Sequence, residues 1–193
     1  MAKKKQLADP TKLANYQAFY AELQKETERG AAIVGAEFLN QHLAQYITNY
    51  LIDDAAATYK LLNPRDPGAP LGTFGARCQL AYCLGLIDAI ALLELNTVRS
   101  IRNRFAHGLP GTTFATPEVA ALVARLKFSE RLPEPMPNLD QWSHFVVSVA
   151  LLLQHISVNT KQVQERRLEP ADELVWYLSD KPVKLPKADD LKP

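Results

Sequence analysis

The stretch from residue 140 to about residue 167 limits the possible folds more than any other part of the chain. From Phe145 to Leu153 it is apolar at every position except Ser148. That run is much shorter than the roughly 20 apolar residues that a membrane-spanning helix needs. A helix that is apolar nearly all round must be covered by neighbouring elements. The sequence therefore predicts a buried helix at the centre of a bundle.

Apolar residues at three- and four-residue spacing predict further helices around it. We expect these at residues 12–27, 33–62 with a break at 53–54, 74–86, 88–107 and 117–128. Glu28, Arg29 and Gly30 are expected to separate the first two. Thr73 can cap the helix that follows it, and Gly108 is a stop signal at the end of another. Residues 63–72 and 132–138 are rich in proline and read as loops.

The resulting fold class is all-α, with a single-domain bundle of six or seven helices. Residues 1–10 are expected to form a disordered basic lead, and residues 11–168 the helical domain. Residues 169–193 are expected to be a partly ordered tail containing prolines, docked through Trp176 and Tyr177. We find no alternating pattern that predicts strands.

Charge and cysteine content restrict the partners. The 22 basic and 21 acidic side chains leave a net charge of +1, whereas a dedicated DNA-binding domain usually carries a basic excess.

Cys78 and Cys83 have neither the spacing of a metal site nor that of a redox motif, and they are expected to be two reduced core thiols. We expect no signal peptide, membrane span, metal or cofactor, and a cytoplasmic location.

The most polar helix end is Ile101-Arg102-Asn103-Arg104-Phe105-Ala106-His107-Gly108. On a wheel of about 100° per residue, Val98, Ile101 and Phe105 share a core stripe of roughly 60°. One flank of that stripe carries Arg99, Asn103 and His107, with Arg102 at its border and Arg104 in solvent.

These residue types suit phosphodiester chemistry without a metal. Histidine can transfer a proton near neutral pH, and arginine can stabilise charge on phosphorus. Arg102 and His107, however, lie about 140° apart on an ideal helix. They converge only if the helix unwinds near Gly108 or a second copy supplies one of them. In a purely structural alternative, His107 caps its helix and Arg102 pairs with a carboxylate such as Glu28 or Glu94.

Three segments resemble the mannitol operon repressor family over roughly residues 25–165. They are residues 28–34 (ERGAAIV), residues 69–87 from APLGTFGAR to LAYCLGLI, and residues 101–107 (IRNRFAH). The resemblance implies an all-helical protein that helps to repress mannitol uptake genes, with Glu28, Arg29 and Arg77 as supporting motif positions. Because no helix-turn-helix is recognisable, we favour action through a protein partner, while direct DNA binding stays open.

The third segment is also similar to the signature of the HEPN superfamily, which includes metal-independent ribonucleases. That likeness implies catalytic roles for Arg102 and His107, with Asn103 orienting them, in a groove between two copies of the chain acting on RNA. Three hypotheses follow. The favoured one is a non-enzymatic regulator that uses Arg99, Arg102, Asn103 and His107 for recognition. The alternatives are such a nuclease and a helical scaffold.

Overall fold

The computed structural model describes residues 19, 21–131, 139–170, 175–177 and 182–184. Within them the chain forms six α-helices, one 3-10 helix and two short strands, and a further helix precedes them at residues 19 and 21–23. The helices are α2 (Glu28–Tyr50), α3 (Ala55–Leu62), α4 (Phe74–Cys83), α5 (Ala89–His107), α6 (Pro117–Val123), η1 (Phe128–Arg131) and α7 (Gln141–Gln164). The all-α prediction is confirmed. The antiparallel pair β1 (Val175–Tyr177) and β2 (Pro182–Lys184) was not expected.

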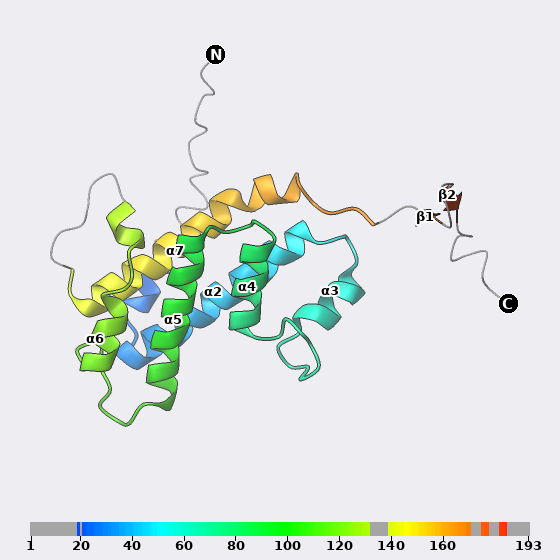
Figure 1. Ribbon diagram of the computed structural model, residues 1–193. Helices are drawn as coiled ribbons and strands as arrows, with labels where there is room; N and C mark the ends of the chain where they lie inside the picture. The colour runs from blue at the N-terminus through cyan, green and yellow to red at the C-terminus, as the bar shows by residue number, and fades with distance from the viewer. Residues whose placement is uncertain (1–18, 20, 132–138, 171–174, 178–181, 185–193) are drawn as a thin grey trace, which may run out of the picture.

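The two longest helices, α2 and α7, make the most extensive contact in the bundle. Helix α5 packs against both, and Figure 1 shows α4 and α6 on opposite sides of it. The core is drawn from all three long helices, including Leu39, Leu43, Leu95, Ile101, Phe145, Val149 and Leu152. The position predicted for residues 145–153 at the bundle centre is thus correct, because Phe145, Val149, Leu152 and Leu153 are fully buried.

Local capping explains where most helices begin. A side-chain oxygen accepts a hydrogen bond from the first turn at Thr27, Asp54, Thr73, Asp88 and Asp140. The Thr27 hydroxyl accepts from Gly30 N at 3.0 Å. Glu28, Arg29 and Gly30 therefore form the first turn of α2, and the prediction that they separate two helices is wrong.

Helices α4 and α6 end earlier than expected, as does the first helix, which ends at residue 23 and not at 27. Helix α4 stops at Cys83 because Gly85 adopts the left-handed conformation, with φ of 66°. Leu86 N then donates to Ala81 O at 2.9 Å, which closes a Schellman turn. Helix α6 stops at Val123, and Lys127 N donates to the buried Glu94 carboxylate instead of continuing the helix to residue 128.

The expectation of two core thiols is also corrected. Cys78 is buried, whereas Cys83 is exposed. The predictions for residues 1–10, 12–18, 20 and 132–138 lie outside the described residues, as do the side chains of Trp176 and Tyr177. Phe19 and residues 21–23 are helical. None of the described helices is long and apolar enough to cross a membrane.

Candidate functional site

The polar end of α5 carries its core stripe as predicted. Val98, Ile101 and Phe105 are completely buried. Arg99 and Asn103 are partly buried, while Arg102, Arg104 and His107 are exposed. The same helix therefore holds the core together and presents charge to solvent.

The candidate residues are divided between two hollows. Arg99, Arg102 and Asn103 line a cavity of about 480 Å³ together with residues of α2 and the start of α4. Asn103 and His107 line a neighbouring hollow of about 420 Å³. The Arg102 guanidinium donates from Nη1 to Asn103 Oδ1 at 3.1 Å. The single chain thus brings Arg102 and Asn103 together but leaves His107 in a different hollow.

Arg29, not His107, caps the end of α5. Its guanidinium donates to the carbonyls of Phe105 at 2.6 Å, Leu109 at 3.0 Å and Gly108 at 3.3 Å. Gly108 itself has extended backbone, with φ of −73° and ψ of 156°. The helix stops where predicted, but a side chain from α2 bonds to the carbonyl of Phe105 in its last turn and to those of the two residues that follow.

The carboxylates considered as partners of Arg102 have other hydrogen bonds. Glu28 accepts from Phe114 N at 2.5 Å, which ties the start of α2 to the segment before α6. Glu94 is fully buried and accepts from Lys127 N. Among the described residues the Arg102 guanidinium bonds to Asn103 and forms no ion pair with either carboxylate, so the proposed pairing with Glu28 or Glu94 is wrong.

Arg77 is a buried structural residue, with 2% of its surface exposed. It donates to Leu62 O and Asn40 Oδ1, each at 2.6 Å, and to Leu71 O at 2.9 Å. These bonds fix the loop before α4 against α2. Burial lowers the pKa of Arg77, partly offset by the nearby Glu37 carboxylate.

Sequence reasoning missed the residues that complete the larger cavity. They include Glu37 and Asn40 from α2 and Thr73 and Gly75 from the start of α4. Glu37 accepts hydrogen bonds from Asn40 Nδ2 at 3.3 Å and Gln41 Nε2 at 3.2 Å. Gly75 in the first turn of α4 could have indicated a close approach at this cavity. Its missing side chain leaves room for the Arg99 guanidinium.

A serine–histidine contact lies elsewhere, between η1 and α7. Ser129 Oγ and His144 Nε2 are 3.1 Å apart, and His144 also bonds to the backbone of Leu126. Burial is the largest cause that lowers the pKa of His144. We assign this pair to packing, because it joins η1 to α7 away from both hollows. Among the described residues no group of three His, Cys, Asp or Glu could hold a metal ion.

Comparison with known proteins gives one informative likeness. No protein-family model and no curated protein matches the chain. The X-ray structure of the MtlR–HPr complex from Escherichia coli has a chain that superposes with a TM-score of 0.60 at 21% identity. The match covers 75% of this chain and 99% of that one. The chain therefore has an MtlR-like, all-helical fold.

Proposed function

We propose that the chain is a non-enzymatic regulator that works by binding a partner protein. The fold supports this, because the bundle spans nearly the whole of a chain from the MtlR–HPr complex. Its near-neutral charge of +1 also favours protein contacts over binding driven by DNA phosphates. HPr is accordingly the first partner to test. We further propose a cytoplasmic location and a role in repressing mannitol uptake genes, in line with the sequence resemblance.

Exposed polar side chains that bond to no other helix among the described residues carry the proposal. Arg102 bonds only to its neighbour Asn103 among the described residues, and His107 is exposed beside it on the last turn. Buried arginines such as Arg77 already serve the fold. Exposed arginine is enriched at protein interfaces, where it can contact an acidic surface.

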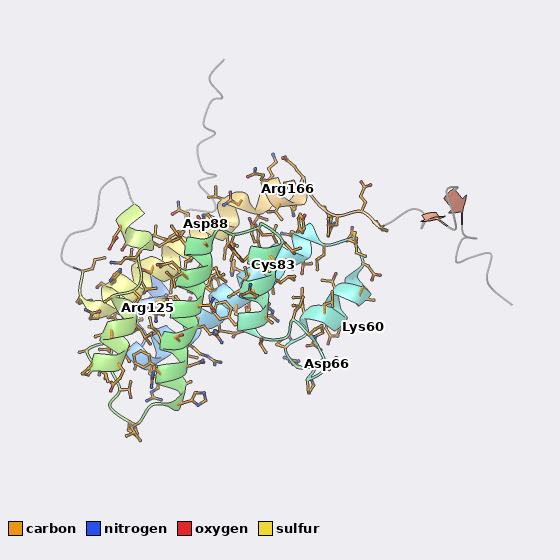
Figure 2. The ribbon with its side chains drawn as sticks, in the orientation of Figure 1. Lys60, Asp66, Cys83, Asp88, Arg125 and Arg166 are labelled. Atoms are coloured by element: carbon orange, nitrogen blue, oxygen red, sulfur yellow. The ribbon has the colours of Figure 1, made fainter. Side chains whose placement is uncertain are left out.

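Calorimetric titration with HPr from the same organism tests this proposal. We expect binding that weakens between about 0.1 M and about 1 M salt, because exposed charges are screened. An Arg102→Ala, His107→Ala double variant should bind at least about tenfold more weakly. Arg125→Ala is the matched control. Figure 2 shows Arg125 over α6, on the other side of α5 from the loop that carries Asp66.

The outcomes are distinct. Unchanged affinity in the double variant would remove α5 from the interface. No binding to HPr, together with tight and sequence-selective binding to operator DNA, would overturn partner-mediated action. Deletion of the gene should raise transcription of mannitol uptake genes, and unchanged transcription would refute the proposed target.

One observation supports a nuclease as the second candidate. Asn103 holds the Arg102 guanidinium, as the orienting residue of an RNA-cleaving site should. His107 would then have to come from a second copy, because within one chain it lines another hollow. Incubation with single-stranded RNA decides the matter. Cleavage lost in His107→Ala would establish the nuclease, and equal inactivity of both proteins would exclude it.

A further inference from the structure

We propose that the cavity between α2, α4 and α5 binds the phosphate group of a small, hydroxylated phosphomonoester. The cavity has a volume of about 480 Å³, within the range typical of small-molecule sites. Its charged lining residues among those described are Arg99 and Arg102 of α5 and Glu37 of α2. This site goes beyond partner binding and exists in the isolated chain.

The two arginine charges are not neutralised internally. Among the described residues, neither Arg99 nor Arg102 forms an ion pair with a carboxylate. Arg99 Nε is buried and has no hydrogen-bond partner there. An unpaired buried donor is costly, and a charged guanidinium especially so. Nε itself is shielded from the cavity, but an oxyanion in the cavity would supply the counter-charge that the Arg99 guanidinium lacks.

Arg99 also lies against the positive end of a helix. A Cβ atom built on Gly75 would be 3.1 Å from Arg99 Nη1 and 3.4 Å from its Cζ. Gly75 belongs to the first turn of α4, where N–H groups have no intrahelical acceptor and the helix dipole is positive. Two adjacent positive groups repel each other. An anion in the cavity beside both groups would be attracted by each of them.

The other side chains indicate what the anion is attached to. Guanidinium groups match the geometry of phosphate oxygens. Glu37 would repel a phosphate placed next to it, but its carboxylate can accept hydrogen bonds from hydroxyl groups. Asn103 and Thr73 add further polar atoms to the wall. The ligand therefore fits with its phosphate toward the arginines and its hydroxyl groups toward α2.

Calorimetric titration of the full chain with glucose 6-phosphate, inorganic phosphate and glucose tests the site. We expect glucose 6-phosphate to bind, inorganic phosphate to bind more weakly and glucose not to bind. Arg102→Gln and Arg99→Gln should each weaken binding of glucose 6-phosphate about tenfold or more. Arg125→Gln should leave its binding unchanged. Gly75→Ala keeps both arginines but places a methyl group against Arg99, and should also weaken binding.

Three results would overturn the proposal. They are failure of glucose 6-phosphate to bind at millimolar concentration, binding of glucose with equal affinity, and undiminished binding in both arginine variants. Circular dichroism of each variant separates loss of the site from loss of the fold. Since HPr is absent from this titration, failure here leaves the partner proposal standing. Loss of HPr binding likewise leaves this site standing.

Discussion

The guanidinium of Arg29 donates a 2.6 Å hydrogen bond to the carbonyl of Phe105, joining the first turn of α2 to the last turn of α5. Two further bonds to the carbonyls of Gly108 and Leu109 complete the cap. Because Glu28, the preceding residue, accepts from Phe114 N, two neighbouring side chains fix both ends of the α5–α6 connection. Residues 28–34 and 101–107, singled out separately in the sequence, form one structural unit.

Replacing Arg29 should therefore destabilise the fold. Arg29→Met removes three hydrogen bonds to carbonyls, and we expect the free energy of unfolding to fall by about 1–3 kcal/mol. Urea denaturation followed by circular dichroism measures this through a lower midpoint at unchanged slope. Arg125→Met is the matched control, because Arg125 is exposed and should have little effect. Equal stability of the two variants would contradict the capping role.

Arg77 is expected to matter more than Arg29. Arg77→Met leaves the buried oxygens of Leu62 and Asn40 and the partly buried oxygen of Leu71 without their donors. The expected loss is roughly 3 kcal/mol or more, since each unsatisfied buried acceptor is costly. Arg77→Lys keeps the charge but cannot reach all three acceptors, so it should recover only part of the stability. If urea denaturation shows that Arg77→Lys has the full stability of the unmodified protein, the positive charge of Arg77 and not its hydrogen-bond geometry stabilises the fold.

Local sequence patterns predicted where most helices begin. They did not predict the Arg29 cap on α5, because it depends on a long-range hydrogen bond. Thr73 and Asp88 cap helices from within three residues, so their roles can be read from neighbouring positions. Arg29 and Phe105 are 76 residues apart, and no local pattern pairs them. For the same reason the structural alternative gives His107 the capping role that Arg29 fills. Gly85 ends α4 by a conformation that a helical stripe of apolar residues does not reveal.

The residues that line the cavity likewise could not be predicted from local sequence patterns. Periodicity placed Arg99, Asn103 and His107 on one flank of α5, but it could not show which helices face that flank. Glu37 and Asn40 come from α2, more than fifty residues earlier in the chain. The helical wheel nevertheless predicted correctly that Arg102 and His107 do not converge within one chain, because they line separate hollows.

The two cysteines should react at very different rates. Five residues apart on a helix, they point about 140° away from each other, so one faces the core and the other solvent. Burial raises the pKa of Cys78 to about 12, which leaves almost no thiolate at neutral pH. We expect a chromogenic disulfide reagent to modify Cys83 quickly and Cys78 only when the protein unfolds. The Cys83→Ser variant should show no fast phase, and a fast phase in that variant would place Cys78 within reach of solvent.

Stability should fall in mild acid through His144. Its folded-state pKa lies below the ordinary value of 6.5 because burial disfavours the charged ring, so the unfolded chain binds more protons between the two values. The free energy of unfolding is therefore highest above the unfolded pKa and decreases as pH falls toward the folded pKa. Urea denaturation from about pH 8 to about pH 5 covers this range. His144→Gln should flatten that part of the profile, and an unchanged slope would assign the dependence to other groups.

The exposed residues of α5 should be dispensable for folding. Arg102 bonds only to Asn103 among the described residues, and both Arg102 and His107 are exposed. We expect Arg102→Ala and His107→Ala each to change the free energy of unfolding by no more than about 0.5 kcal/mol, as is usual for surface positions. A loss comparable to that of Arg29→Met would favour the scaffold hypothesis, in which the motif exists to hold the bundle together. Unchanged stability combined with weaker binding to HPr would separate recognition from folding at the end of α5.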